Sequence, residues 1–328
     1  MTVRLVPILA VCTVLNAEQR ADIRVEVDLV AVACSVTDRG GSPAKNLRPE
    51  DFIVRDNGVP QKLKYLWQES ELPLTIGLIV DVSGSQMGFV NQHRETVARF
   101  LSQVLGPKDR AFLVQIAQKV RLVTGLTNSI DQLGDGVRTI GTRAAKEAPL
   151  LGDPCKGHGI LFGCGGTALW HGLYFAALLE KRPLTGRKAL IVLTDGMDTG
   201  SDRSVSDVIE AAQGAETAVY TIKYASPARF ISPALMLRSA LSHGLERLAI
   251  ETGGVPFSHP KDKTSQVFAQ IESDLRNLYV LGFTPPDDAR DGKFHKLEVK
   301  TARPDLVVRT RAGYYARGGG LTPPEPSR

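Results

Sequence analysis

The residues best suited to chemistry follow a short apolar run in the first third of the chain. Leu78–Val80 leads into Asp81, and Ser83 and Ser85 follow at alternate positions, so that one carboxylate and two hydroxyls come after a strand-like segment. Hard oxygen ligands of this kind suit Mg²⁺ or a similar cation. Because Ser and Gly after Asp also form ordinary turns, this segment by itself does not identify a metal site.

Two later segments could supply further oxygen ligands. Gly166 and Thr167 open a segment with an apolar stripe, and the apolar run Ala189–Leu193 is followed by Thr and then Asp195. In an open α/β sheet, ligands collect at the carboxyl ends of the strands, where the chain order reverses. Asp81 and Asp195 are therefore expected at the same edge of one sheet.

Taken in this order, the three motifs resemble the metal-ion-dependent adhesion site of von Willebrand factor type A (VWA) domains. The resemblance implies five metal-ligand positions, namely Asp81, Ser83, Ser85, Thr167 and Asp195. It implies that the two serines bind directly, the threonine directly or through water, and the two aspartates often through water. An Asp or Glu carboxylate of a partner protein would take the remaining position on Mg²⁺, or on Mn²⁺ or Ca²⁺ in its place.

Four neighbouring residues are expected to shape these loops: Gly84, Gly166, Gly196 and Asp198. Gly84 would let its loop turn tightly, and Gly196 would let the backbone approach closely. Asp198 would either orient a water at the metal or be a solvated turn residue.

Two features of the sequence could change the surface that meets a partner. The commonest form of the motif has Met directly after the second serine, whereas here Gln86 comes before Met87. The segment 141–166, which precedes Thr167, is long for a loop in a compact domain. Loops of that length are often functional, so we expect it beside the metal, with simple tolerance of an insertion as the alternative.

The four cysteines indicate a redox compartment only indirectly. Cys155 and Cys164 bracket a Gly-rich stretch and could close it as a disulfide in an oxidising compartment. A zinc site that also uses His158 is the alternative, but a fourth ligand is not evident. Cys34 lies in an apolar strand and is expected to be a small buried residue. Cys12 lies within the apolar N-terminal segment.

The hydrophobic pattern changes twice along the chain. Residues 23–68 and 278–316 alternate in the manner of β-strands, and Asn57-Gly58 predicts a hairpin between Phe52–Val54 and Lys62–Leu66. Between them, short apolar strands alternate with amphipathic helices, which predicts a largely parallel sheet covered on both faces. The strands are expected at 75–80, 111–116, 119–123, 189–194, 217–224 and 255–258, and the helices at 89–105, 128–140, 167–180, 204–214, 234–252 and 264–277. The 111–123 pair predicts one antiparallel edge strand.

The expected fold class is therefore α/β, a doubly wound, mostly parallel, Rossmann-like sheet with flanking strands that form a small β-sandwich. The expected division is a signal peptide (1–17), an N-terminal β region (18–72), a VWA domain (73–277), a C-terminal β region (278–316) and a disordered tail (317–328). The flanks also resemble the bacterial secreted group called VWFA-related proteins, on the segments Asp28–Val32, Ser35–Asp38, Leu47–Phe52, Asp195–Thr199, Tyr279–Phe283, Asp291–Phe294 and Arg311–Tyr315.

Composition excludes some classes of function. Of 328 residues, 43% are hydrophobic and 23% charged, as in ordinary globular proteins. The net charge of +5 is spread along the chain, which argues against nucleic acid as a partner. A short charged start, an apolar stretch of about eleven residues and a small residue before a polar run fit a secretory signal peptide. That stretch is too short to span a bilayer, so we expect a secreted or periplasmic protein.

Three functions are compatible with these observations. The first is a divalent-cation-dependent protein-binding module of the adhesion type, without turnover. The second is an intracellular VWA subunit of a larger, chelatase-like assembly, which the β flanks disfavour. The third is a metal-dependent hydrolase, for which the motifs offer no His or Glu placed as a general base; His171, one helical turn after Thr167, is expected to pack or to face solvent.

Overall fold

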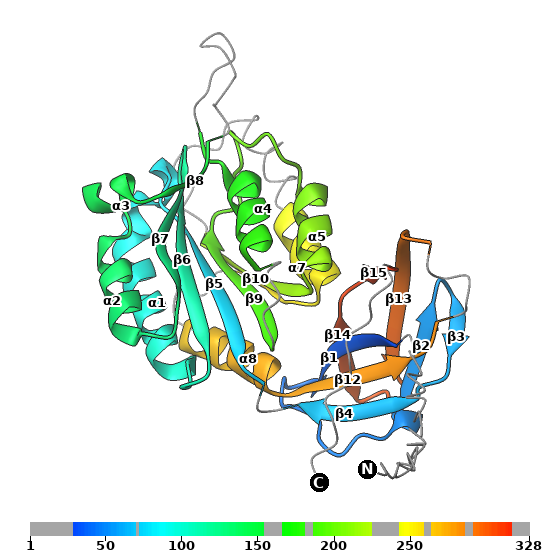
Figure 1. The fold of residues 1–328 in the computed structure, drawn as a ribbon. Helices are drawn as coiled ribbons and strands as arrows, with labels where there is room; N and C mark the ends of the chain where they lie inside the picture. The colour runs from blue at the N-terminus through cyan, green and yellow to red at the C-terminus, as the bar shows by residue number, and fades with distance from the viewer. Residues whose placement is uncertain are drawn as a thin grey trace, which may run out of the picture.

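The computed structural model describes residues 29–69, 72–153, 166–180, 186–224, 243–258, 264–285 and 291–316. These residues form two units, an α/β domain and a β-sandwich, which lie side by side (Figure 1). Along the chain, the β-strands of the sandwich lie on either side of a segment in which strands and helices alternate.

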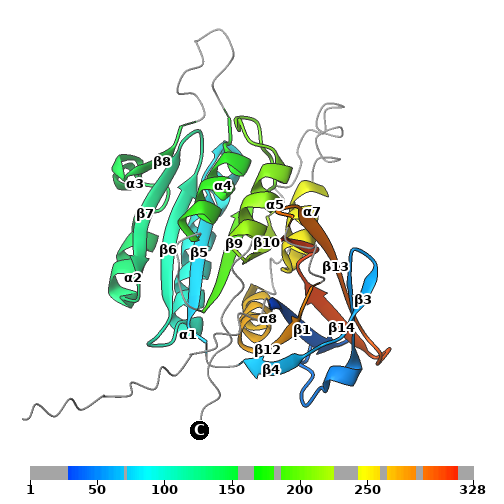
Figure 2. The ribbon, with the colours of Figure 1, turned by 45° about the vertical axis from the view of Figure 1, so that its right-hand side comes forward.

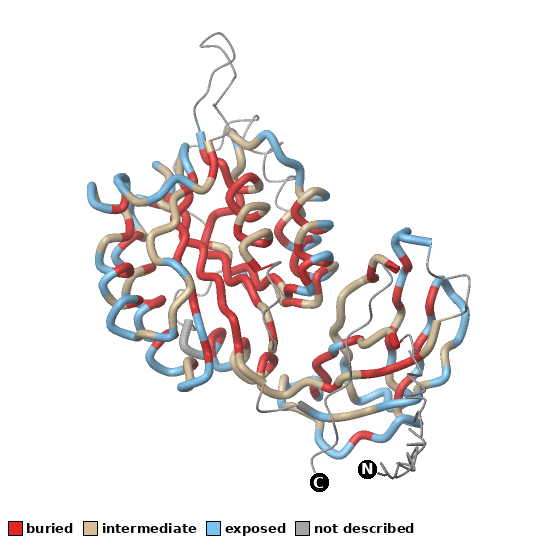
Figure 3. Tube along the Cα trace, in the orientation of Figure 1, coloured by how far each residue is buried: buried red, intermediate tan, exposed pale blue. Residues whose placement is uncertain are grey.

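A seven-stranded mixed sheet forms the centre of the α/β domain. Its spatial order is β11 (Pro256–Ser258), β10 (Thr217–Lys223), β9 (Arg187–Thr194), β5 (Leu74–Asp81), β6 (Arg110–Ile116), β7 (Val120–Thr127) and β8 (Leu150–Gly152). The first five strands are parallel to one another, and β7 and β8 are antiparallel to their neighbours. Every residue of β5 is buried, as expected for a central strand covered on both faces (Figure 3).

Helices cover both faces of this sheet (Figures 1 and 2). One face carries α1 (Val90–Val104), α2 (Ile130–Thr139) and α8 (Thr264–Arg276), and the other carries α4 (Leu169–Glu180), α5 (Val205–Gly214) and α7 (His243–Thr252). Successive side chains of β5 point to opposite faces, so Leu78 joins the first core and Ile79 the second. The predicted doubly wound fold is confirmed.

The two flanks of the sequence build one β-sandwich. One sheet has the order β14 (Leu306–Thr310), β1 (Val30–Asp38), β12 (Leu278–Phe283), β4 (Tyr65–Glu69), and the other has the order β15 (Gly313–Tyr315), β13 (Phe294–Thr301), β2 (Phe52–Asp56), β3 (Val59–Gln61). Strand β1 pairs with both β12 and β14, and β2 pairs with β13. Both sheets contribute to one apolar core, so the expected pairing of the flanks is confirmed.

Two local predictions were wrong. The hairpin at Asn57-Gly58 exists, with both residues at positive φ, but its second strand is Val59–Gln61. Tyr65 and Leu66, which were expected in that strand, instead begin β4, which lies in the other sheet and pairs with β12. The segment 141–166 is also not a plain loop. It begins with α3 (Arg143–Glu147) and β8, which extends the central sheet at its edge.

Candidate metal site

Asp81 ends β5 at the centre of the sheet and is almost fully buried. The parallel register places it beside Thr194, the last residue of β9. The Thr194 hydroxyl donates to Asp81 Oδ2 at 2.6 Å, and the backbone N–H of Ser83 donates to Asp81 Oδ1 at 2.9 Å. Each oxygen of the Asp81 carboxylate is therefore held in place by a hydrogen bond from the protein itself.

Asp195 follows Thr194 directly and is also buried, with its Oδ1 accepting from the Met197 N–H at 2.9 Å. The pKa of Asp81 is raised to about 6, mainly by burial and in smaller part by the negative charge of Asp195, against the donors from Ser83 and Thr194. Two carboxylates that disfavour each other's charge in a buried position would both be stabilised by a bound cation.

Ser83 and Ser85 lie at the start of the 3₁₀ helix η2 (Gly84–Phe89), with their hydroxyl oxygens 3.2 Å apart. Ser83 is the N-cap residue of η2. The expectation that Gly84 is needed for a tight turn was wrong. The φ angle of Gly84 is not positive, and a Cβ added there would meet open space.

Thr167 is held by its backbone, which leaves its side chain available. Its N–H donates to the Thr199 hydroxyl at 3.0 Å, and its carbonyl accepts from the N–H groups of Thr199 and Gly200 at 3.1 and 3.0 Å. Gly166, at φ 125°, must be glycine, because a Cβ there would lie 2.1 Å from the Thr199 hydroxyl. Gly196, at φ 83°, similarly lies against Leu245.

Asp198 has a role that sequence reasoning did not give it. Its Oδ1 accepts from the N–H groups of Leu169 and Trp170 at 2.8 and 3.3 Å, and from the Ser201 hydroxyl at 2.5 Å. It therefore satisfies the first N–H groups of α4, whose N-terminus immediately follows the Thr167 loop. These contacts show that Asp198 is not simply a solvated turn residue. It ties the loop after Asp195 to the loop that carries Thr167.

The donor set fits a hard divalent cation. Two carboxylates and three hydroxyls are oxygen ligands, and the buried Asp81 and Asp195 carry like charges close to each other. Among the described residues, no group of three or more His, Cys, Asp and Glu side chains is arranged to hold a metal ion. Any cation at this edge would thus depend on the serine and threonine hydroxyls, as expected for Mg²⁺ rather than for a Cys- or His-bound metal.

Sequence reasoning missed the side chains that support the site. Thr194 was predicted only as the last residue of a strand, and Thr199 and Ser201 were given no role. A polar residue at the end of an otherwise apolar strand was the available signal for Thr194. Gln86 was expected at the partner-facing rim but is fully buried, whereas Met87 beside it is 62% exposed.

His171 packs inside the domain, which is one of the two expected outcomes. Its ring is buried against Phe175, and its Nδ1 lies 2.5 Å from Asp202 Oδ1. Its backbone N–H donates to the Ser201 hydroxyl at 2.9 Å. These contacts join the first turn of α4 to the segment that also carries Asp198.

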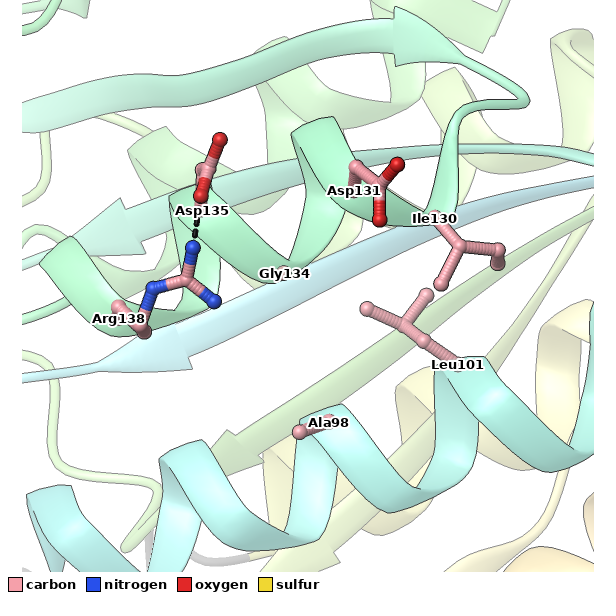
Figure 4. A pocket seen from close by; sticks show the side chains of 7 residues that line it. All are labelled: Ala98, Leu101, Ile130, Asp131, Gly134, Asp135 and Arg138. Atoms are coloured by element: carbon pink, nitrogen blue, oxygen red, sulfur yellow. Dashed lines mark hydrogen bonds and ion pairs between the residues drawn. The ribbon is translucent and has the colours of Figure 1, made fainter.

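A separate hollow of about 490 Å³ lies between α1 and α2 (Figure 4). It is lined by Ala98, Leu101, Ile130, Asp131, Gly134, Asp135 and Arg138. An ion pair between Asp135 and Arg138 forms part of its wall. The hollow lies between two helices on one face of the sheet, and none of the predicted metal ligands lines it.

The three motifs thus end or follow neighbouring elements of a doubly wound sheet, with Asp81 on β5, Asp195 after β9 and Thr167 before α4. This is the arrangement that the sequence resemblance implied. The α/β domain is VWA-like in fold.

Similarity to known proteins was found only among solved structures. No protein-family profile and no curated protein sequence matches the chain. Similar solved structures include BatB from Bacteroides thetaiotaomicron, with 13% identity over 60% of this chain and 97% of that chain at a TM-score of 0.40. The vWF domain of the type V pili tip protein Mfa5 from Porphyromonas gingivalis has 12% identity over 61% of this chain and 94% of that chain, at 0.41.

Proximal thread matrix protein 1 from the mussel byssus, solved with a zinc-occupied MIDAS motif, has 15% identity. The match covers 67% of this chain but only 49% of the mussel protein, at a TM-score of 0.46. Identities and TM-scores at this level do not carry a function across to this chain.

Some predictions lie outside the described residues. These are the signal peptide (1–17), the disordered tail (317–328) and the Cys155–Cys164 disulfide. Cys34 is described, and it is buried in β1 as expected, where burial raises the pKa of its thiol to about 12. Within the described ranges, no helix combines the length and apolar character needed to cross a bilayer.

Proposed function

We propose that this protein is a divalent-cation-dependent protein-binding module of the adhesion type. Asp81, Ser83, Ser85, Thr167 and Asp195 would hold Mg²⁺, with Mn²⁺ or Ca²⁺ as alternatives, and a partner would present an Asp or Glu carboxylate. The observation that carries the proposal is the pair of buried carboxylates at the ends of β5 and β9, together with the adjacent hydroxyls of Ser83 and Ser85 at the start of η2.

The chain's own residues would act by position rather than by turnover. Thr194 and the Ser83 N–H direct the Asp81 carboxylate, and Thr199 and Gly200 fix the backbone of Thr167. The bound cation would supply the positive charge that attracts an external carboxylate to its open coordination position. Met87, which is 62% exposed two residues after Ser85, would offer an apolar contact beside that carboxylate.

The wider assignment belongs to the same proposal. The protein is a secreted or periplasmic VWFA-related protein, in which the VWA domain (73–277) is inserted between the two β regions (18–72 and 278–316). The apolar N-terminal stretch supports export, and the pairing of β1 with β12 and β14 supports the insertion. The partner is a protein rather than nucleic acid, since the basic residues are not gathered into a cluster in the sequence.

Water-proton relaxation of the Mn²⁺-loaded protein tests this function. Mn²⁺ with an exchangeable water strongly enhances relaxation, and an incoming carboxylate displaces that water. We expect short Asp-containing peptides to lower the enhancement, and matched peptides with Asn in place of Asp to leave it unchanged. Enhancement that no peptide carboxylate lowers would rule out an open coordination position and with it the adhesion-type function.

The substitution Asp195→Asn serves as the control for this experiment. It keeps the size of the side chain and removes one of the two buried carboxylates. The enhancement from bound Mn²⁺ should then be lost before any peptide is added. If it persists in Asp195→Asn, the cation binds elsewhere on the protein.

A further inference from the structure

Gln86 lies next to the proposed ligand Ser85 and yet points into the protein. It is fully buried, whereas Ser85 before it and Met87 after it are exposed. It is the buried residue of η2. Burying a primary amide destabilises a protein unless the amide forms hydrogen bonds. The hydrogen-bond partners of Gln86 therefore show what its side chain holds in place.

Two partners fix the orientation of the Gln86 amide. Its Nε2 donates to the carbonyl of Tyr224 at 3.3 Å, and its Oε1 lies 3.2 Å from His93 Nε2. A backbone carbonyl can only accept, so the NH₂ group must face Tyr224 and the oxygen must face His93. His93 Nε2 must therefore carry the proton and donate.

His93 is suited to that single role. It is fully buried on α1, and its ring makes an edge contact with Tyr224 at 4.6 Å between centroids and packs near Phe89 at 6.2 Å. Burial lowers the pKa of His93 to about 4, so the ring is neutral at pH 7. Its Nδ1 has no hydrogen-bond partner, which leaves Gln86 as the polar partner of the ring.

These contacts belong to a closed ring of hydrogen bonds that includes the proposed ligand Asp81. The Thr194 hydroxyl donates to Asp81 Oδ2, and the Thr194 carbonyl accepts from the Tyr224 N–H at 2.9 Å. The Tyr224 carbonyl accepts from Gln86, whose own N–H donates to the Ser83 carbonyl at 2.9 Å. The Ser83 N–H donates to Asp81 Oδ1, which closes the ring. Gln86 is the one member of the ring whose side chain ties η2 to the end of β10.

We infer that Gln86 is a positioning residue that holds the Ser83–Ser85 loop rigidly over Asp81 and thereby favours Mg²⁺ over Ca²⁺. The inference rests on the proposed cation site and assigns its ion selectivity to a residue that is not a ligand. Mg²⁺ requires near-ideal octahedral geometry at short distances, whereas Ca²⁺ accepts irregular and variable ligand sets. A loop released from its anchor therefore loses more affinity for Mg²⁺ than for Ca²⁺.

Calorimetric titration of the full-length chain with Mg²⁺ and with Ca²⁺ tests this inference. Gln86→Met keeps the length of the side chain and removes its amide. The affinity for Mg²⁺ should fall roughly 10-fold or more, in the range typical of residues that orient metal ligands. The affinity for Ca²⁺ should fall less, so that the Mg²⁺/Ca²⁺ selectivity ratio falls.

Gln213→Met is the matched control. Gln213 is a buried glutamine whose Nε2 donates to the Glu251 carbonyl at 3.0 Å, and it lies on α5 away from the serine loop. The Gln213→Met variant loses a buried amide of the same kind, so its unfolding free energy should fall as well. Its selectivity ratio should equal that of the wild type. An equal fall of the ratio in both variants would attribute the effect to general loosening and overturn the inference.

His93→Phe provides a second variant in case Gln86→Met does not fold. It keeps an aromatic ring against Phe89 and Tyr224 and removes the donor to Gln86 Oε1. The ratio should fall in the same direction, by less than in Gln86→Met. An unchanged ratio in the folded variants would overturn the role of Gln86, whereas a wild-type chain that binds neither cation would overturn the proposed function itself.

Discussion

At the scale of single residues, the buried carboxylate of Asp81 should destabilise the protein when no cation is bound. Burial and the nearby charge of Asp195 both disfavour its ionised form. Asp81→Asn removes the charge and keeps the shape, and the Thr194 hydroxyl can accept from an amide as well as donate to a carboxylate. We expect the variant to be more stable than the wild type in EDTA, by on the order of 1 kcal/mol, as measured by chemical unfolding.

The same variant should lose its response to cations, so that saturating Mg²⁺ reverses the order of stability. Asp135→Asn, at an exposed position on α2, is the control and should behave as the wild type in both conditions. An Asp81→Asn protein that is strongly destabilised in EDTA would show that the ionised carboxylate is needed for folding. One that still responds to Mg²⁺ would show that Asp81 is not a ligand.

At the scale of elements, the contact between Asp198 and the first turn of α4 links two loops of the site. Asp198→Ala removes an acceptor for the N–H groups of Leu169 and Trp170, so the unfolding free energy should fall by about 1 kcal/mol, as for the loss of a helix cap. Because the Thr167 loop leads directly into α4, the affinity for Mg²⁺ should fall too. Chemical unfolding and titration with Mg²⁺ measure the two effects.

Ser204→Ala separates these two effects. Ser204 caps α5 in a reciprocal pair with Asp207 and makes none of the Thr167 contacts. Its loss should lower the unfolding free energy by a similar amount and leave the Mg²⁺ affinity unchanged. If both variants lower the affinity equally, the site responds to stability in general and Asp198 has no specific part in it.

The elements themselves could be predicted where the hydrophobic pattern is long. The runs that became β5 and β9 are continuous and apolar, and the helices carry apolar stripes, so their type and order were predictable. Short elements such as β8 and α3 carry too few residues for a pattern. The switch of β4 to the other sheet depends on its pairing with β12, more than 200 residues away, which local sequence does not encode.

The meeting of Asp81 and Asp195 at one edge of the sheet was predictable for a similar reason. Its proposed ligands come from motifs with fixed spacing, and the structure brings the ends of β5 and β9 together. The supporting contacts could not be predicted, because Thr194, Thr199 and Gln86 act through partners far away in the sequence. Gln86 in particular would be taken for a surface residue until its partners on α1 and at the end of β10 are seen.

At the scale of the whole molecule, α8 leads directly into β12, with only Asn277 between them. Near this junction, Asp274 of α8 is buried and lies 3.5 Å from Arg309 of β14. A second contact is the Ala312 N–H, which donates to the Glu251 carbonyl on α7 at 2.9 Å. The two units are therefore joined by a covalent link and by polar contacts, one of which contains a buried carboxyl group.

Asp274 should make the stability of the molecule depend on pH. Burial raises its pKa to about 6 from an ordinary 3.8, although Arg309 acts in the opposite direction. A raised carboxyl pKa contributes stability that is complete below about pH 4 and is lost as the pH rises through 6. The loss amounts to at most about 3 kcal/mol. Arg309 acts directly on this carboxyl, and Asp274 in turn acts on the buried Tyr220, which also interacts with Arg187 and Arg309.

Asp274→Asn tests this dependence through unfolding free energies measured at pH 4.5 and pH 7.5, with Asp135→Asn again as the control. Relative to the wild type, the variant should gain stability at the higher pH. The difference between the two proteins should shrink toward the lower pH. A difference that is the same at both pH values would show that Asp274 does not titrate in this range.

If the edge of the sheet formed by β5 and β9 binds a divalent cation, that cation should stabilise the folded protein. Thermal and chemical unfolding of the full-length chain in EDTA, Mg²⁺, Mn²⁺ or Ca²⁺ tests it most directly. A cation that binds only the folded state should add about 2.7 kcal/mol at 100 times its Kd, with a corresponding rise in Tm. We predict that rise for Mg²⁺ and Mn²⁺. Identical unfolding in EDTA and in all three cations would contradict it.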